Sequence, residues 1–173
     1  MWVKRLSSRS ASFGEIEAVY RQDGAAFERV AIAIVGDDQL GCDAVQDAFV
    51  LALRNRGNFR GDAPLVAWLW RILINEARKR RARDLGVLST DPSLLESEAV
   101  SMNGAADRAQ VRAVIAGLPE RQRLVLFLRH YADLDYATIA EALEIKPGTV
   151  AAALSTARDR LREQLQEVHE WEL

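Results

Sequence analysis

The sequence predicts an all-α protein: two small helical domains joined by a flexible acidic linker, with a helix-turn-helix in the second domain. Two observations predict this class. Apolar residues recur at helical spacing in both halves, as at Phe27, Val30, Ala31 and Ile34, and no segment alternates as a strand does. A polar, acidic stretch without Lys or Arg interrupts the apolar stripes near the middle of the chain, which divides the helices into two packets.

Charge sets the domain boundaries. Residues 1–86 hold 14 Lys and Arg against 11 Asp and Glu, a net charge of +3. Residues 87–173 hold 9 against 14, a net charge of −5, and the two halves together give the net charge of −2. Five cations fall within residues 78–83, and the acidic stretch that follows them repels itself and stays extended. The boundaries that we predict are a first domain over 12–85, a linker over 86–106 and a second domain over 107–168.

Composition excludes several classes of protein. With 173 residues and a single cysteine, Cys42, the chain cannot be a disulfide scaffold, and its apolar runs are far shorter than the roughly 18 to 20 residues of a membrane span. No signal-peptide core follows the first ten residues, so we expect a cytoplasmic protein without membrane insertion. His130 and His169 lack metal-ligand spacing and no enzyme motif is present, so we expect no metal, cofactor or catalytic residue.

Three helices are predicted in the first domain. Residues 36–38 end the first helix and cap the second, residues 55–63 form a loop with two glycines, and Pro64 stands in the first turn of the third helix. The third helix runs into the basic cluster. Trp68 and Trp70 stand two residues apart and cannot face the same side, and we expect Trp68 in the core because it falls on the apolar stripe.

The second domain ends in a pattern typical of a helix-turn-helix. Residues 111–118 and 120–128 predict two helices, and a short helix over 136–143, a turn over 144–146 and a long helix from Pro147 follow them. In that geometry the N-terminal residues of the last helix enter the major groove of DNA. Short helix pairs with tight turns also occur in proteins that never touch DNA, so the pattern alone leaves both interpretations open.

The order of residues, and not only their spacing, points to a family. The second domain contains Leu118-Pro119, Arg123, Leu134-Asp135-Tyr136, Ile139-Ala140-Glu141, Leu143, Ile145, Gly148-Thr149-Val150, Leu154 and Ala157-Arg158. This order resembles region 4 of bacterial sigma factors. The first domain resembles region 2 of the same proteins. The residues that carry this resemblance are Asp43, Gln46, Asp47 and Phe49, then Phe59-Arg60-Gly61, Trp68-Leu69-Trp70-Arg71-Ile72 and Asn75. Over residues 12–165 the chain resembles a sigma factor of the extracytoplasmic-function (ECF) group, whose compact members keep only these two regions.

The resemblance implies partners and site residues. Sigma factors of this group are not enzymes; they bind core RNA polymerase, direct it to promoter DNA and help separate the strands, and an anti-sigma factor commonly holds them inactive. By similarity, the residues that bind the polymerase clamp helices are Asp43, Gln46 and Asp47. Those that bind the minus-ten element are Asn58, Phe59, Arg60, Gly61, Asp62, Arg71, Asn75, Arg78 and Lys79. Those of the helix-turn-helix that bind DNA are Arg123, Lys146, Thr149, Ser155, Thr156 and Arg158.

The chemistry of these residues suits the implied roles. Carboxylates and an amide accept hydrogen bonds from a partner's Arg side chains, amides read an unstacked base, and cations follow phosphates. A plainer interpretation is that Asp43 and Asp47 favour the start of a helix and that the basic run offsets a helix dipole. Five cations are more than a helix dipole needs at its C-terminal end. For Asp43 and Asp47, the family motif around them favours a polymerase contact.

The recognition helix departs from the family pattern. Glu144 stands where relatives usually have Gly, so a positive φ in the turn would strain it, and Lys146 stands where they usually have Pro. Relatives commonly carry Lys, Ser and Arg where this chain has three alanines, at residues 151–153, which neither bond a base edge nor anchor a phosphate. We therefore expect weak or tolerant reading of the minus-thirty-five element, with much of the promoter discrimination left to region 2.

Two other classes of protein remain open at this point. The alanines permit a sigma-like adaptor or decoy that binds polymerase or an anti-sigma factor without reading a promoter. The helix-turn-helix permits an ordinary transcription regulator. Transcription with purified core polymerase separates the three, because a sigma factor initiates, a decoy binds core without initiating, and a regulator does not bind core as an interchangeable subunit.

Overall fold

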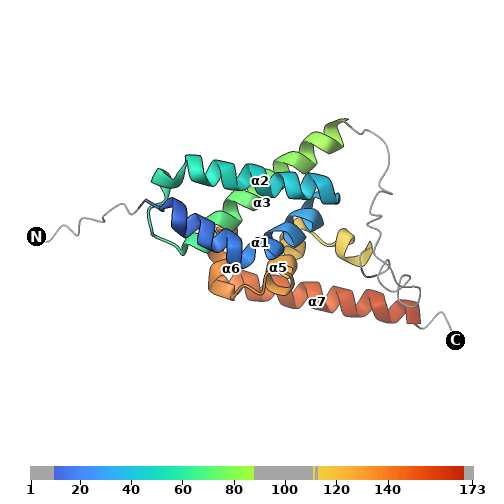
Figure 1. The fold of residues 1–173 in the computed structure, drawn as a ribbon. Helices are drawn as coiled ribbons and strands as arrows, with labels where there is room; N and C mark the ends of the chain where they lie inside the picture. Colours follow the sequence, from blue (N-terminus) through green and yellow to red (C-terminus); the bar gives the residue numbers. More distant parts are fainter. Residues whose placement is uncertain (1–9, 88–110, 112, 170–173) are drawn as a thin grey trace, which may run out of the picture.

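Three long helices form the first domain. A computed structural model of the chain describes residues 10–87, 111 and 113–169. In it α1 (Phe13–Val35), α2 (Asp38–Arg54) and α3 (Leu65–Val87) pack against one another, and a short 3-10 helix, η1 (Arg56–Asn58), follows α2 (Figure 1). The prediction of three helices with a loop before the third is confirmed.

Local hydrogen bonds explain where the first two helices begin and end. Ser12 and Glu15 form a capping box at the start of α1, with the backbone N–H of Glu15 donating to Ser12 Oγ at 3.2 Å. Gly36 ends α1 with φ 90°, a left-handed conformation that glycine adopts without strain. Asp37 then caps α2 by accepting from the backbone N–H of Leu40 at 2.8 Å. The chain therefore reverses direction at the residues that the sequence indicates.

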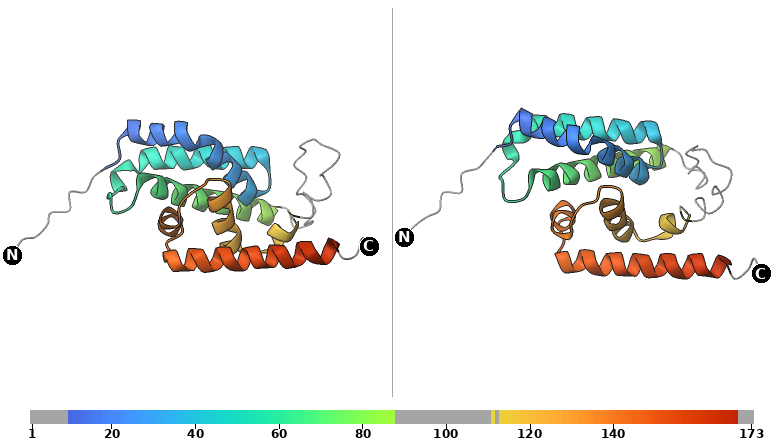
Figure 2. Two further views of the ribbon diagram at one scale, coloured as in Figure 1. Left: turned by 90° about the horizontal axis from the view of Figure 1, so that it is seen from below. Right: turned by 60° about the horizontal axis from the view of Figure 1, so that its bottom comes forward.

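The second domain is also helical. Helical residues 113–117 lead to α5 (Glu120–His130), and α6 (Tyr136–Leu143) and α7 (Pro147–His169) form the helix-turn-helix that the spacing predicts. Figure 2 shows α5 and α6 lying between the first domain and α7 in both views. The predicted linker lies outside the described residues from position 88 onward.

The core of the first domain corrects one prediction. Trp70, not Trp68, is the fully buried tryptophan, with its ring centroid 4.3 Å from that of Phe27. Trp68 is only partly buried and lies against Phe59, at 5.5 Å between centroids. The prediction was wrong because it assumed a single buried stripe. α3 packs against α1 and α2 and also against α6, so residues outside that stripe are buried as well.

The two domains share one apolar core, although the sequence predicts two packets. Buried residues of α1, α2 and α3 form a contiguous cluster with those of α5, α6 and α7, and α3 packs directly against α6. Across the same boundary Arg29 Nη2 of α1 donates to the backbone carbonyl of Tyr131 at 3.1 Å. The helix-turn-helix is thus held against the first domain by apolar packing as well as by polar contacts.

The turn of the helix-turn-helix contains a strained residue, Glu144. Glu144 ends α6 with φ 55° and ψ 44°, the left-handed conformation in which a β-carbon is unfavourable. Its backbone N–H bonds back to the carbonyl of Glu141, and the N–H of Ile145 bonds to the carbonyl of Ala140 at 2.9 Å. The turn does take a positive φ at position 144, so the strain that the sequence analysis attached to that condition is present, and glycine would fit better here.

We predict that Asp135 stabilises α6 in a pH-dependent way. Its carboxylate accepts from the backbone N–H of Thr138 at 2.7 Å, and this hydrogen bond lowers its pKa below the usual 3.8. Because the folded pKa is the lower one, the contribution is complete above about pH 4 and is lost as the pH falls through the folded pKa. Asp135→Ala should destabilise the protein by about 1 kcal/mol at pH 7.

Urea titrations monitored by circular dichroism at pH 7 and at successively lower pH values test this prediction. Asp135→Asn is the matched control, because an asparagine still caps the helix but does not titrate. An Asp135→Ala variant with unchanged stability at pH 7 would contradict the capping role.

Candidate polymerase and nucleic-acid interface

One arginine of α3 organises the acidic face of α2. Asp43 and Asp47, one turn apart on α2, both accept hydrogen bonds from Arg80, whose Nη1 lies 3.0 Å from Asp43 Oδ2 and whose Nη2 lies 2.6 Å from Asp47 Oδ2. The Arg80 side chain is 21% exposed, and the hydrogen bond to Asp47 is the largest cause of its raised pKa. Gln46 and Asp47 remain exposed. The three predicted polymerase-binding residues therefore lie together on a surface whose carboxylates are fixed from α3.

Much of the basic run at the end of α3 has partners within the protein. Arg80 holds the acids of α2, and Arg81 Nη1 donates to the backbone carbonyl of Ile34 at 3.2 Å. Lys79 Nζ, on the exposed side, pairs with Glu76 Oε1 at 2.7 Å. Sequence patterns show the density of charge in this run but not that Arg80 and Arg81 fasten α3 to α2 and α1.

The predicted minus-ten residues of α3 form one line. Arg71, Asn75 and Arg78 stand at positions i, i+4 and i+7 and so share a helix face. Both arginines are paired with the second domain: Arg71 Nη1 lies 2.7 Å from Glu144 Oε1, and Arg78 Nε lies 2.7 Å from Glu120 Oε1. The structure brings the three residues together, with both arginines engaged by acids that the sequence analysis does not single out.

The predicted strand-reading loop adjoins this helix. Its exposed residues are Asn58, Arg60, Gly61 and Asp62. Phe59 is different, because it is 8% exposed and packs against Trp68. The ring contact ties the loop to the start of α3, and Gly61 turns the chain with φ 74°. Phe59 therefore positions the loop in this arrangement, while the polar residues around it face solvent.

The recognition helix presents few groups that bond to DNA. Its exposed predicted residues are Ser155, Thr156 and Arg158, with Thr149 half-buried, and the exposed Lys146 lies in the turn just before it. Ala151 and Ala152 are exposed as well, whereas Ala153 is 9% exposed and belongs to the core. The Thr156 hydroxyl donates to the carbonyl of Ala152 at 3.0 Å, within the helix. Methyl groups thus occupy much of the surface that would face a base edge.

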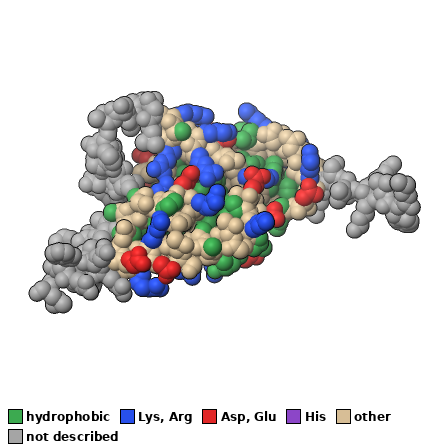
Figure 3. All heavy atoms as spheres, turned by 180° about the vertical axis from the view of Figure 1, so that it is seen from behind, with side chains coloured by type: hydrophobic (Ala, Val, Ile, Leu, Met, Phe, Trp, Pro, Cys, Tyr) green, Lys and Arg blue, Asp and Glu red, His purple; other side chains and the backbone are tan. Residues whose placement is uncertain are grey.

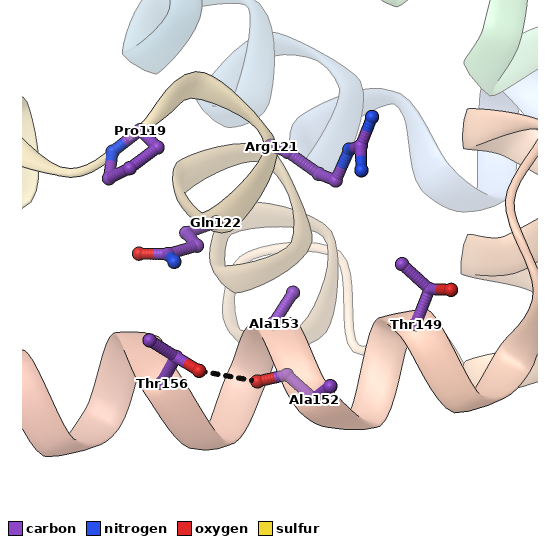
Figure 4. Close-up of a pocket in the computed structure, with 7 residues that line it drawn as sticks. All are labelled: Pro119, Arg121, Gln122, Thr149, Ala152, Ala153 and Thr156. Atoms are coloured by element: carbon purple, nitrogen blue, oxygen red, sulfur yellow. Dashed lines mark hydrogen bonds between the residues drawn. The ribbon is translucent and has the colours of Figure 1, made fainter.

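An open pocket lies between the start of α5 and the recognition helix (Figure 4). The residues that line it are Pro119, Arg121, Gln122, Thr149, Ala152, Ala153 and Thr156. Figure 4 shows Arg121 and Gln122 above the first turns of α7. The sequence analysis missed Arg121, although a cation in the first turn of a helix, where the dipole disfavours it, is a signal that could have drawn attention to it.

Arg123 has a structural position. Its Nη1 donates to the backbone carbonyls of Ala116, at 2.9 Å, and Leu118, at 3.4 Å. These bonds satisfy acceptors at the end of the helical turn over 113–117, where no intrahelical donor remains. Burial lowers the pKa of Arg123. The guanidinium that the family resemblance assigns to DNA is therefore occupied by the backbone of its own domain.

The remaining surface supports a binding protein. Figure 3, which shows the molecule from behind, has Lys and Arg side chains across the middle of that face with a few acids among them. Within the described ranges no group of His, Cys, Asp or Glu could hold a metal ion, and no helix has the length and apolarity needed to cross a membrane. Cys42 has a raised pKa, mainly because of burial, so its thiol is not activated.

A three-helix domain with an acidic face and a line of cations, joined to a helix-turn-helix domain, is an arrangement that suits a DNA-binding protein of transcription. Family comparisons agree: sigma-70 region 2 matches residues 19–85, and sigma-70 region 4 matches residues 108–161. The chain is 33% identical to the RNA polymerase sigma-H factor of Pseudomonas aeruginosa, over 87% of this chain and 92% of the relative. It is 31% identical to the ECF RNA polymerase sigma-E factor of Escherichia coli, over 72% and 73% respectively.

Solved structures agree with these matches. The sigma factor RpoE of Bartonella quintana, in complex with the anti-sigma factor NepR, superposes with a TM-score of 0.67 at 26% identity, over 88% of this chain and 97% of that one. CnrH, in complex with the cytosolic domain of CnrY, superposes with a TM-score of 0.69 at 21% identity, over 91% of each chain, which shows the shared fold.

The chain therefore belongs to the ECF sigma factors, with sigma-70 regions 2 and 4. It is an alternative sigma factor that directs promoter-specific transcription initiation with RNA polymerase, and it is not an enzyme.

Proposed function

We propose that α2 is the polymerase-binding helix of this sigma factor, with Asp43, Gln46 and Asp47 as its contacts. The observation that carries this proposal is the bridge from Arg80 to both acids, because it fixes two carboxylates on one exposed face. Fixed carboxylates bind arginines of a partner at a lower entropic cost than mobile ones. The partner is the clamp of core RNA polymerase, as the family predicts.

Strand opening is the proposed role of α3 and the loop before it. Arg71, Asn75 and Arg78 form a line two turns long. Side chains arranged in this way can contact successive phosphates along a single DNA strand. The exposed loop residues at positions 58 and 60–62 stand at one end of that line and supply amide, backbone and charged groups for an unstacked base. This set would bind the non-template strand of the minus-ten element.

Region 4 is proposed to read the minus-thirty-five element weakly. The exposed side of α7 offers Ser155 and Arg158, beside two alanines that contribute no hydrogen bond, and Lys146 lies in the turn before the helix. Arg121, at the edge of the pocket, adds a cation that suits a phosphate. We therefore expect most promoter discrimination in region 2, and we expect the polymerase to supply most of the hold on DNA.

An anti-sigma factor is the remaining proposed partner. The structure of the Bartonella quintana relative was solved in complex with an anti-sigma factor, and the superposition covers 97% of that relative's chain. We propose that an anti-sigma factor regulates this chain in the cytoplasm, where core polymerase and promoter DNA are found.

The test is transcription from fragmented genomic DNA of the source organism, with purified core polymerase and the full chain, followed by sequencing of the transcript 5′ ends. A sigma factor with the proposed roles gives starts that share a strong minus-ten motif and a weak or variable minus-thirty-five motif. Binding to core without initiation would favour the decoy, and no binding to core would favour the ordinary regulator. A sharp minus-thirty-five motif would overturn the proposed weakness of region 4.

A further inference from the structure

The pocket between α5 and the recognition helix has a floor of methyl groups. Four residues of α7 line it, at i, i+3, i+4 and i+7, and therefore share one side of the helix: Thr149, Ala152, Ala153 and Thr156. Each of these side chains carries a methyl group. The hydroxyl of Thr156 is already used, because it donates to the backbone carbonyl of Ala152 at 3.0 Å (Figure 4). Thr156 therefore offers the pocket its methyl group.

One polar group of fixed orientation reaches this pocket from α5. Arg160 Nη1 donates to Gln122 Oε1 at 3.3 Å. A guanidinium only donates, so the oxygen of the Gln122 amide has to face Arg160 and the nitrogen is left for another partner. Among the residues that the structure describes, nothing accepts a hydrogen bond from that nitrogen. Gln122, which is half-buried, therefore brings a hydrogen-bond donor to the methyl-lined floor.

A donor beside methyl groups matches one base edge of the major groove. Thymine presents the O4 acceptor and, on the neighbouring ring carbon, the C5 methyl group. Cytosine presents an amino donor at the position of O4 and has no methyl group. Adenine and guanine present the N7 acceptor without a methyl group beside it. Of the four bases, only thymine therefore offers both an acceptor for the amide and a methyl group for the floor.

The pocket also lies where DNA meets a helix-turn-helix. It is open, and Thr149 stands in the first turn of α7, the part of a recognition helix that enters the major groove. Arg121 is an exposed cation at the edge of the pocket, where it suits a phosphate. Because phosphate contacts fix the register of a protein on the duplex, a contact at Arg121 would hold one base edge opposite the pocket.

We infer that this pocket is a thymine site. Gln122 donates to O4, and the methyl groups of α7 receive the C5 methyl group of one thymine in the minus-thirty-five element. The inference rests on the proposed placement of region 4 on that element, and it names the base that region 4 reads there. One hydrogen bond and an apolar contact discriminate less than a bidentate pair does. The site therefore gives a preference for thymine at one position and not a sharp motif.

Base analogues test the site without altering the protein. The full chain with core polymerase transcribes a promoter found by mapping transcript starts, and each position of the minus-thirty-five element is set in turn to thymine or to deoxyuridine, which lacks only the methyl group. Competition between the two templates in one reaction gives the ratio of initiation. At one position we expect about two- to fourfold less initiation from uracil. At that position 5-methylcytosine, which keeps the methyl group but turns an amino donor toward Gln122, should lower initiation about five- to tenfold.

Protein variants then assign the effect to the pocket. Thr149→Ser with Thr156→Ser deletes two methyl groups of the floor and keeps both hydroxyls, so the ratio of thymine to uracil should fall close to one. Gln122→Ala removes the donor, and the ratio of thymine to 5-methylcytosine should fall to about twofold. Thr138→Ser is the matched control, because it deletes a methyl group from α6, outside the pocket, and should keep both ratios at their wild-type values.

Two results would overturn the inference. In the first, no position distinguishes thymine from uracil. In the second, the serine double variant keeps the wild-type ratio, because the methyl group is then read elsewhere on the protein. Initiation from the unmodified template reports the proposed function separately. Anisotropy titrations of the full chain with the same labelled duplexes give the ratios without initiation, so a failure of the thymine site and a failure of the proposed function remain distinguishable.

Discussion

Replacing Gly41 with alanine should destabilise the protein by about 2 to 3 kcal/mol, although alanine is the better helix former. Gly41 lies in α2, where α1 crosses it. A β-carbon at this position would lie 2.6 Å from Ile32 Cγ1 and 2.8 Å from the Cα and N atoms of Ile32. Because two of these atoms belong to the backbone, no rotamer change relieves the collision, and α1 and α2 have to move apart.

The matched control for this variant is Gly14→Ala. Gly14 lies in the first turn of α1, and a β-carbon there would meet nothing within 4 Å. The same substitution should therefore be neutral or stabilise the protein by up to about 1 kcal/mol. Urea unfolding followed by circular dichroism gives both values, and equal effects at the two positions would contradict the close helix crossing.

Replacing Arg80 with methionine should weaken binding to core polymerase about tenfold, which corresponds to about 1.4 kcal/mol. The change removes two charge-assisted hydrogen bonds and leaves Asp43 and Asp47 as like charges one turn apart. The carboxylates then lose the orientation in which they meet the polymerase. Arg80→Lys should be intermediate, because an ammonium is a point charge and does not form the same fork.

Core binding by the Arg80 variants is measured by competition with a labelled wild-type chain, well below their melting temperatures. Arg81→Met is the control, since Arg81 fastens the same part of α3 to the carbonyl of Ile34 without touching the acids of α2. It should lower stability and leave core affinity near that of wild type. An Arg80→Met variant that binds core as well as Arg81→Met does would show that Arg80 only stabilises the fold.

Residue spacing was sufficient to predict the helices and several of their ends. The cap at Asp37 and the start of α3 directly after Pro64 follow from local steric and hydrogen-bonding rules, which involve only a few neighbouring residues. The lack of hydrogen-bonding groups at Ala151 and Ala152 was also evident from the sequence, whereas only the fold shows that Ala153 belongs to the core. The two motif sets also identified the family before any tertiary contact was considered.

Contacts between distant residues could not be predicted in the same way. Spacing favoured Trp68 for the core, but α3 has neighbours on two sides and buries Trp70. The sequence of the basic run predicts one charged surface. In the structure, however, Arg80 bonds to an acid of α2 and Arg81 bonds to a backbone carbonyl of α1. Which side of a helix meets which partner depends on the packing of the whole chain, and a one-dimensional pattern contains no such information.

The sequence by itself determined the class, the two regions and the residues with the right chemistry, because helical periodicity, caps and motif order are local properties. Only the tertiary structure decided how these residues are used. It placed Arg80 between two acids of α2, and it set Arg71 and Arg78 against Glu144 and Glu120. A charge acquires a partner only when folding brings an opposite charge within a few ångströms, and these partners are 33 to 73 residues away along the chain.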